Sequence, residues 1–495
     1  MNRVGFDNAH YLKLQSEHIK ERIEQFGGKL YLEFGGKLFD DYHAARVLPG
    51  FAPDSKVRML LQLKDQAEIL IVINAADIEK NKVRGDLGIT YDLDVLRLID
   101  AFRDFGLYVG GVVISQYAEQ HAAKQFRARL EELGIRVYLH YPIAGYPSDI
   151  ALIASEDGFG KDDYIETTRP LVVLTAPGPG SGKMSVCLSQ LYQDDIRGIQ
   201  SGYAKFETFP VWNLPLRHPV NIAYEAATAD LDDLTMIDPF HLDAYGITTI
   251  SYNRDIEVFP VLQALFQRIW GQCPYQSPTD MGVNMAGNCI TDEAVVIKAA
   301  RQEIIRRYYA AMCAHHQGLG EKSTVLKLEL LMNQAETSVT ERRVVAAALE
   351  RAERSGQAAA AIEMPDGTLL SGKMSSLLSA PSAMLLNALK YLAGLDDRLL
   401  LISPTVIEPV QELKTVHLRN ADPRLHVEEM LIALSICAVT DPDAQAAIDQ
   451  LSELAGCEVH STLLLSQADE VTFRKLGMNL TCEPQYQTHK LYQTE

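Results

Sequence analysis

The stretch LVVLTAPGPGSGKMSVCLSQLY, Leu171–Tyr192, decides the fold. Its first four residues are apolar and β-branched or leucine, which is typical of a buried strand. A glycine- and proline-rich turn follows. The next apolar residues, Val186, Leu188, Leu191 and Tyr192, suit one face of a helix. We therefore expect a strand, a tight loop and a helix in immediate succession.

The flanking sequence repeats this alternation. Strand-like runs at Ala67–Asn74, Leu107–Ser115 and Ile135–Ile143 are separated by the amphipathic runs LDVLRLIDAFRDFG and AEQHAAKQFRARLEELG. Buried strands separated by helices of this length indicate βαβ units. The sequence therefore predicts an α/β fold with a mainly parallel, Rossmann-like sheet.

Towards the C-terminus the pattern changes twice. Long helical runs such as ITDEAVVIKAARQEIIRRYYAAM occupy the middle of the chain, and an α/β alternation returns after the turn MPDG at Met364–Gly367. We predict three parts: an α/β domain at 1–285 that carries the glycine-rich, phosphate-binding-like loop, a helical segment at 286–358, and a C-terminal α/β domain at 359–495.

The loop resembles a degenerate P-loop, G-x-x-x-x-G-K-[ST] between a strand and a helix. Such a loop wraps phosphate with backbone N–H groups, and its lysine adds positive charge. The predicted phosphate-binding residues are Gly178, Gly180, Ser181, Gly182, Lys183 and Ser185. Pro177 stands where the first glycine belongs, and Met184 stands where Ser or Thr would meet Mg²⁺. Anion binding, NTP hydrolysis and a purely structural glycine turn all remain open.

Four aspartates downstream form a candidate metal site. Asp230, Asp232, Asp233 and Asp238 lie within nine residues, and Asp238 follows a short apolar run as a Walker B aspartate does. Carboxylates of this kind hold Mg²⁺. The cofactor prediction is therefore Mg²⁺ with a nucleotide. A solvated acidic loop with helix caps is the alternative.

Between the loop and the aspartates, YAKFETFPVWNLPLRHPVN places charged residues among aromatics and prolines. Lys205, Glu207 and His218 are the candidate catalytic residues, for proton transfer or substrate orientation. A packed loop, with an ordinary hydrogen-bonded histidine, has the same composition.

Two short repeats raise further candidates. SGKMS recurs at Ser371–Ser375, where we expect a turn leading into a helix. FGGKL occurs at Phe26–Leu30 and Phe34–Leu38, and two interpretations are open for it. Either Lys29, Lys37, His43 and Arg46 form a cationic pocket, or the glycines mark the turns of a hairpin or strand pair.

In the C-terminal part, we expect Cys457 and Cys482 to be buried cysteines and His460 to be a hydrogen-bonded histidine.

Composition limits the partners. The 495 residues include 65 acidic and 46 basic ones, a net charge of −19, which disfavours nucleic acid and anionic membranes. The seven scattered cysteines, with no C-x-x-C pair, favour a reduced cytoplasmic chain, and no apolar run is long enough to span a bilayer. We expect a small phosphorylated ligand as partner, with homo-oligomer formation through the helical segment as an option.

Longer strings carry a resemblance to a family. LYLEFGGKLFDDYHAARVLPGF, LTAPGPGSGKMSVCLSQLY, MIDPFHLDAYG, YNRDIE and SPTDMGVNM are similar to the UPF0371 family of bacterial proteins, also called DUF1846, and the similarity runs nearly end to end. The resemblance implies a multi-part α/β cytoplasmic bacterial protein. It transfers no catalytic residues, so the site predictions rest on the residues themselves.

Three functions follow from these patterns. The first is an enzyme that binds a nucleotide or other phosphorylated metabolite at 178–185. The second is a metabolic enzyme, such as an isomerase or lyase, that holds a phosphate handle without NTP hydrolysis, and Pro177 and Met184 favour it. The third is a non-catalytic regulatory or assembly protein.

Overall fold

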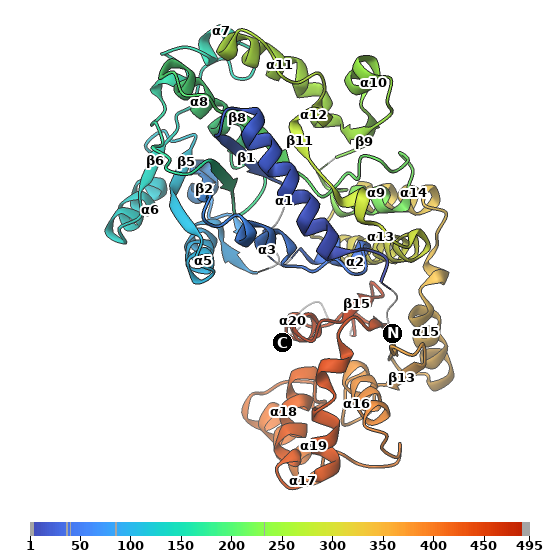
Figure 1. Cartoon of the computed structure of the whole chain (residues 1–495). Coiled ribbons are helices and arrows are strands. Elements are labelled where there is room, and N and C mark those ends of the chain that lie inside the picture. Colours follow the sequence, from blue (N-terminus) through green and yellow to red (C-terminus); the bar gives the residue numbers. More distant parts are fainter. Residues whose placement is uncertain (1–3, 36–37, 40, 85–86, 232, 488–495) are drawn as a thin grey trace. The chain divides into compact units, whose positions relative to one another are not determined.

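The computed structural model describes residues 4–487 except 36–37, 40, 85–86 and 232. Contacts divide the chain into two compact units (Figure 1), one at Val4–Ala300 and one that begins at Arg301. Among the described residues, no helix is long and apolar enough to cross a membrane.

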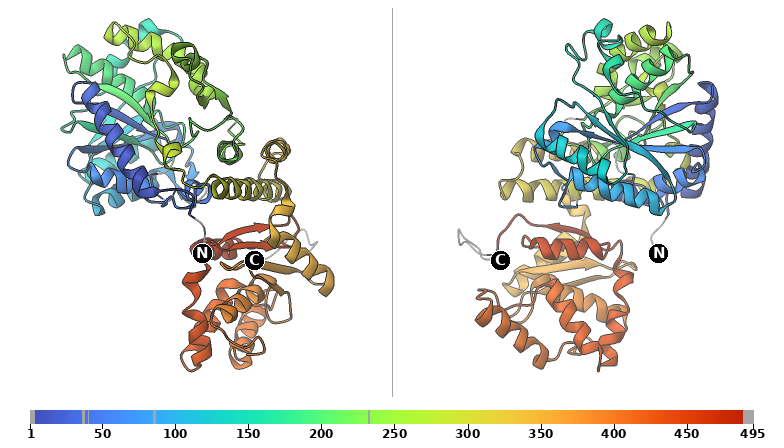
Figure 2. Two further views of the ribbon diagram at one scale, coloured as in Figure 1. Left: turned by 45° about the vertical axis from the view of Figure 1, so that its right-hand side comes forward. Right: turned by 90° about the vertical axis from the view of Figure 1, so that its left-hand side faces the viewer.

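A parallel sheet of seven described strands forms the centre of the first unit (Figure 2). Its order is β11-β8-β1-β7-β2-β5-β6, and every pairing is parallel. The strands are β1 (Leu30–Phe34), β2 (Ala67–Asn74), β5 (Tyr108–Ser115), β6 (Val137–Leu139), β7 (Leu171–Thr175), β8 (Gly202–Phe206) and β11 (Gly282–Val283). The predicted α/β fold with a mainly parallel sheet is confirmed.

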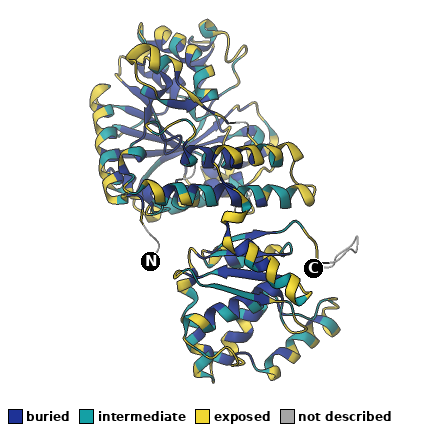
Figure 3. Cartoon of the chain, turned by 90° about the vertical axis from the view of Figure 1, so that its right-hand side faces the viewer, coloured by how far each residue is buried: buried dark blue, intermediate teal, exposed yellow. Residues whose placement is uncertain are grey.

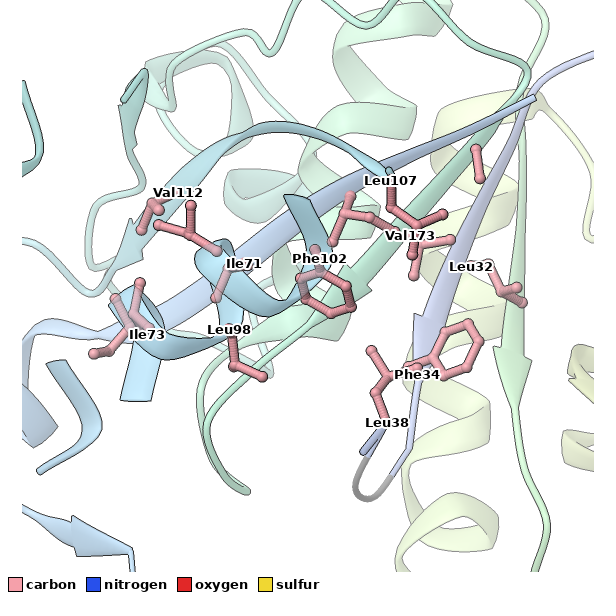
Figure 4. Packing of buried hydrophobic residues seen from close by; sticks show 14 of the residues in the cluster. Leu32, Phe34, Leu38, Ile71, Ile73, Leu98, Phe102, Leu107, Val112 and Val173 are labelled. Carbon is pink, nitrogen blue, oxygen red and sulfur yellow. The ribbon is translucent and has the colours of Figure 1, made fainter. Parts of the chain in front are cut away.

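Helices cover both faces of this sheet. On one face, side chains from α1 (Asn8–Gln25), α3 (Ser55–Gln62), α5 (Tyr91–Asp104) and α6 (His121–Glu132) share a core with alternate strand residues, part of which is drawn in Figure 4. On the other face, α8 (Lys183–Ile196) and α11 (Asn253–Trp270) pack on the remaining strand residues. Strands such as β2 are apolar on both sides because both sides are covered.

Shorter elements connect this framework. The helices are α2 (Tyr42–Val47), α4 (Ala75–Glu79), α7 (Ile150–Ile153), α9 (Pro219–Ala227), α10 (Pro239–Tyr245) and α12 (Pro278–Met281). The 3-10 turns are Phe159–Lys161 and Ala286–Cys289. Two small antiparallel pairs are β3 (Val83–Arg84) with β4 (Ile89–Thr90), and β9 (Thr235–Ile237) with β10 (Ile250–Tyr252).

Helices fill the predicted middle segment. They are α13 (Glu293–His316), α14 (Lys322–Gln334) and α15 (Arg343–Ser355), with a 3-10 turn at Val339–Glu341. Because α13 begins in the first unit and continues into the second, contacts divide the chain within a helix. The division into 1–285, 286–358 and 359–495 stays a prediction.

The second unit contains a four-stranded sheet in the order β13-β12-β14-β15. β12 (Ala359–Glu363) is antiparallel to β13 (Leu369–Lys373) and to β14 (Glu458–Ser461), whereas β14 and β15 (Asn479–Cys482) are parallel. The sheet is buried between helices (Figure 3). The helices of the unit beyond α15 are α16 (Ala380–Leu392), α17 (Pro404–Glu412), α18 (Val427–Ala438), α19 (Pro442–Ile448) and α20 (Gln467–Lys475), with a π turn at Leu413–His417 and a 3-10 turn at Leu451–Leu454.

The prediction of a turn at the second copy of SGKMS is wrong. Ser371, Gly372 and Lys373 lie in strand β13 instead of in a turn, because their backbone pairs with β12. A Cβ at Gly372 would lie 2.1 Å from the backbone nitrogen of Met384, so this glycine lets α16 pack directly on the strand.

Candidate functional site

The carboxyl ends of the parallel strands meet along one edge of the central sheet. β7 lies between β1 and β2, and the chain leaves it to enter the glycine-rich loop. In open α/β sheets, ligands bind outside the carboxyl ends of the strands. The predicted phosphate loop therefore stands at the centre of the edge where such folds bind ligands.

Two glycines give the loop its shape. Gly180 and Gly182 have φ values of 74° and 89°, in the left-handed region that other residues rarely adopt, and Gly182 is the N-cap of α8. Gly178 is close to α5, because a Cβ there would lie 2.2 Å from the Tyr91 hydroxyl oxygen. The glycines thus turn the chain from β7 into the first turn of a 14-residue helix.

Neighbouring strands hold the loop in place. The Asn74 side-chain amide, at the end of β2, donates to the Gly180 carbonyl at 3.3 Å. The Ser115 hydroxyl, at the end of β5, donates to the Ser181 carbonyl at 2.5 Å. Carbonyls are used for these anchors, which leaves the backbone N–H groups at the start of α8 as donors.

The loop side chains differ in what they contact. The Ser181 hydroxyl is buried and has no hydrogen-bond partner among the described residues. Ser185 lies near the Tyr146 side chain and lowers its pKa, although burial raises that pKa overall. Met184 packs against the apolar core under α8. Lys183 opens α8 and is half-buried, and no described carboxylate pairs with it.

At the end of β8, Lys205 lies between two carboxylates. Its Nζ is 2.7 Å from Glu207 Oε1 and 2.5 Å from Oδ2 of Asp255, which lies on α11. Burial alone would lower the pKa of Lys205, but Asp255 and Glu207 raise it above its ordinary value. Burial raises the pKa of Glu207, and Lys205 reduces that rise without removing it. Lys205 therefore keeps its proton, and Glu207 is the group that can exchange one.

Glu33 joins the loop to the Lys205 cluster. It lies on β1, in register with Leu174 of β7 on one side and Lys205 of β8 on the other. Tyr203 donates to its carboxylate at 2.8 Å. Its negative charge acts on Lys205 and also on Tyr146 and Cys187 beside the loop. The candidate site therefore spans the ends of β7, β1 and β8.

Glu33 and Asp255 were not predicted from the sequence. Glu33 interrupts the apolar strand LYLEF, and an isolated carboxylate in a buried run is the signal that identifies such a residue. Asp255 lies in the first turn of α11 and gives no comparable signal, because a carboxylate is common at a helix N-terminus.

His218 occupies a structural position. Its Nδ1 accepts from the Val220 backbone N–H at 3.2 Å and caps α9, and its Nε2 lies 3.4 Å from Glu293 Oε1. Burial lowers its pKa. No interaction among the described residues joins it to Lys205 or Glu207, so the structure does not bring the three predicted catalytic residues together.

The predicted metal ligands are also dispersed. Asp238 is fully buried and accepts hydrogen bonds from the N-terminus of α10 and from Thr279, Asp233 pairs with Arg254, and Asp230 is exposed. Asp232 lies outside the described residues. No group of three or more described His, Cys, Asp or Glu side chains is arranged to hold a metal ion. The Mg²⁺ site stays a prediction without support from these contacts.

The FGGKL repeat forms neither a hairpin nor, in its described part, a shared cationic pocket. β1 pairs in parallel with β7 and β8, so the repeat is not a hairpin, but Gly27 and Gly28 do lie in the turn that precedes this paired strand. Lys29 pairs with the buried Asp194 at 2.8 Å, and His43 packs against Phe209 and Tyr224. Lys37 lies outside the described residues.

Comparison with known proteins identifies relatives over the whole length. Residues 4–336 match the model of the N-terminal domain of unknown function DUF1846, and residues 340–492 match that of its C-terminal domain. UPF0371 proteins of Streptococcus thermophilus and of Streptococcus pyogenes serotype M5 are each 56% identical over 492 residues, which covers 99% of this chain and 100% of theirs. The chain therefore belongs to the UPF0371 (DUF1846) family.

Proposed function

We propose that the first unit is an enzyme domain that binds a phosphorylated small molecule at residues 178–185 and transfers a proton next to it. One observation supports the binding part of this proposal: Lys183 has no counter-ion among the described residues. The other buried or half-buried lysines described in this unit each pair with a carboxylate, Lys29 with Asp194, Lys56 with Asp41, and Lys205 with Glu207.

A lysine without a carboxylate partner at this position can bind an anion. Lys183 stands at the positive end of α8, where backbone N–H groups add to its charge. Phosphate bound there would receive these donors and the lysine together. The buried Ser181 hydroxyl, which lacks a partner among described residues, supplies a further donor in the same loop.

The residues favour a phosphate handle over NTP hydrolysis. Met184 packs into the core and stands where the P-loop hydroxyl would hold Mg²⁺. Ser185 lies one residue further along α8, a rotation of about 100°, so its hydroxyl does not take that position. The second hypothesis, a metabolic enzyme that grips phosphate, therefore fits the loop better than a nucleotide hydrolase does.

The Lys205 cluster would supply the chemistry. β7 and β8 are separated by one strand, so their ends lie about 10 Å apart. A sugar phosphate or similar metabolite spans this separation when its phosphate contacts Lys183. Its carbon skeleton would then reach Glu207, which accepts a proton, while Lys205 stays protonated and stabilises negative charge that develops on the substrate.

Binding is tested with the two copies of SGKMS. Thermal shift and calorimetry would use inorganic phosphate, ribose 5-phosphate, AMP and ATP, with and without Mg²⁺. We expect metal-independent stabilisation by a monophosphate, loss of at least about tenfold in affinity in Lys183→Ala, and no change in Lys373→Ala, whose lysine is exposed on β13. Equal behaviour of the two variants would refute the phosphate site, and stabilisation only by ATP with Mg²⁺ would favour a nucleotide enzyme.

Proton transfer is tested separately. Incubation of the protein with a bound sugar phosphate in D₂O should place deuterium on a ligand carbon. Glu207→Gln should bind the ligand and abolish the exchange, because an amide cannot accept the proton. Retained exchange in Glu207→Gln would contradict this role and leave the binding proposal standing.

The other expectations stay proposals. Cytoplasmic location, the lack of nucleic-acid and membrane partners and homo-oligomer formation rest on the cysteine pattern, the charge of −19 and the helical segment of the sequence.

A further inference from the structure

A pocket of about 310 Å³ lies in the second unit, at the carboxyl ends of the parallel strands β14 and β15. Its apolar lining includes Leu349 and Ala352 of α15 and Leu463, which follows β14. Its volume is at the lower end of the range for small-ligand sites, about 300–1,000 Å³. The carboxyl ends of parallel strands are also where α/β sheets bind ligands.

Glu483 is the one charged residue among those that line this pocket in the described part of the chain. It follows β15 directly, and its backbone N–H donates to the Ser461 carbonyl at 2.9 Å, so its position is fixed by the strand pair. Its side chain is 19% exposed. The remaining lining is apolar or uncharged, with Gln357 and Gln485 as its amides.

Two neutral groups lie beside the Glu483 carboxylate. His460 Nε2 lies 3.2 Å from its Oε1, and burial together with the Glu483 charge raises the pKa of Tyr309. Burial lowers the pKa of His460, so this imidazole is uncharged near neutral pH. The carboxylate thus has no neutralising partner: no described Lys or Arg lies within ion-pair distance of it.

Hydrogen bonds hold the other ring nitrogen of His460, Nδ1, in place. Arg342 Nε donates to Thr481 Oγ1 at 2.9 Å, and Thr481 Oγ1 lies 2.9 Å from His460 Nδ1. The Val459 carbonyl competes for the Thr481 proton at the longer distance of 3.2 Å. Nε2 makes no hydrogen bond within the described residues, so its 3.2 Å approach to Glu483 is a close polar contact.

We propose that this pocket binds a small organic cation, a primary ammonium carried on a short apolar chain. The ammonium would pair with Glu483, and the apolar chain would contact Leu349, Ala352 and Leu463. Leu349 is 44% exposed, so its contact with a ligand removes apolar surface from water. The unpaired carboxylate selects against anions and favours the ammonium over a neutral group of the same shape.

Calorimetry on the full chain tests this with matched probes. n-Butylammonium is compared with n-butanol, which has the same apolar chain without the charge, and with butyrate, which reverses the charge. We expect butylammonium to bind at least about tenfold more tightly than butanol, and butyrate not to bind.

Three variants assign the site. Glu483→Gln keeps the size and shape of the side chain but removes its charge, so it should bind butylammonium and butanol equally. Ala352→Leu should weaken both by filling the pocket. Glu412→Gln, an exposed carboxylate on α17 that does not line the pocket, is the control and should bind as the unaltered chain does.

Circular dichroism of each variant would confirm folding. Equal binding of butylammonium and butanol by the unaltered chain would overturn the proposal, and so would unchanged affinity in a folded Glu483→Gln. No detectable binding of butylammonium at millimolar concentration would also overturn it. None of these results bears on the phosphate loop, which lies in the other unit.

Discussion

The two copies of SGKMS place the same five residues in different structures. The first leaves the central strand β7, turns through Gly182 and begins α8, whereas the second forms the end of strand β13 and the two irregular residues after it. Lys183 is half-buried at a helix N-terminus, and Lys373 is exposed on a strand. The contrast teaches that the chemistry of a lysine here depends on the backbone to which it is attached.

The glycines show why the copies differ. In the first, Gly182 is needed for its positive φ, which lets the strand turn into the helix. In the second, Gly372 is needed for space, because a helix backbone lies where its side chain would be. The same residue thus serves a dihedral requirement in one unit and a packing requirement in the other.

The largest effect is expected from Gly372→Ala. A Cβ would lie 2.1 Å from Met384 N and 2.6 Å from the Ala383 carbonyl carbon, both of which belong to the helix backbone and cannot move alone. We expect a loss of about 3 kcal/mol in the stability of the second unit, measured by urea unfolding. Ser371→Ala on the same strand is the control, and an unchanged midpoint in Gly372→Ala would disprove the packing role.

Gly182→Ala should lower the stability of the first unit by a smaller amount, about 2 kcal/mol. An alanine at this φ is strained, and its Cβ would lie 3.1 Å from the Ser115 hydroxyl. Gly198→Ala isolates the strain, since Gly198 has a similar φ of 70° and no atom within 4 Å of the added Cβ. Thermal melts of both variants give the difference. If Gly182→Ala melts no lower than Gly198→Ala, the contact with Ser115 is unimportant.

The smallest effect is expected from pH, and it differs between one histidine in each unit. Asp422 and Asp469 raise the pKa of His426 to about 9, although burial and Lys414 oppose them, whereas burial lowers the pKa of His140 to about 3. Because the folded pKa of His426 exceeds its unfolded value, its stabilisation is complete below about pH 6.5 and is lost as pH rises through about 9. Because His426 is partly exposed, we expect this contribution to the stability of the second unit to be about 1 kcal/mol.

Unfolding curves between pH 6 and 10 measure this loss, and His426→Gln should remove the pH-dependent part in the second unit. His140 is uncharged across this range and should contribute none of it. A loss of the same size in His426→Gln would show that another group titrates.

Much of the first unit could be predicted from apolar runs alone. AEILIVIN coincides with β2, and LVVL falls within β7, because a strand buried on both faces has few polar residues. The loop and the start of α8 followed from glycine spacing and the apolar face of Val186, Leu188 and Leu191. Ser371–Lys373 was assigned wrongly because an edge strand with two polar residues has no such run.

The site was harder to predict because its parts come from distant segments. Lys205 and Glu207 were identified by composition, yet their partner Asp255 lies 50 residues beyond Lys205 on a helix. Glu33 meets Lys205 only because β1 and β8 pair in register. His218 was assigned to proton transfer from its residue type, and its role as the cap of α9 depends on local backbone geometry. Strand order, which periodicity does not encode, decides which of these side chains meet.

The position of β1 in the sheet has a consequence for synthesis of the chain. Its two partners are β7 and β8. Some 170 further residues must therefore be synthesised after β1 before both of its edges can pair. At about 5–20 residues per second, this interval lasts roughly 10–30 s on the ribosome. During that time LYLEF is an apolar segment with unpaired edges. β1 therefore has both of its partner strands only after translation has passed Phe206.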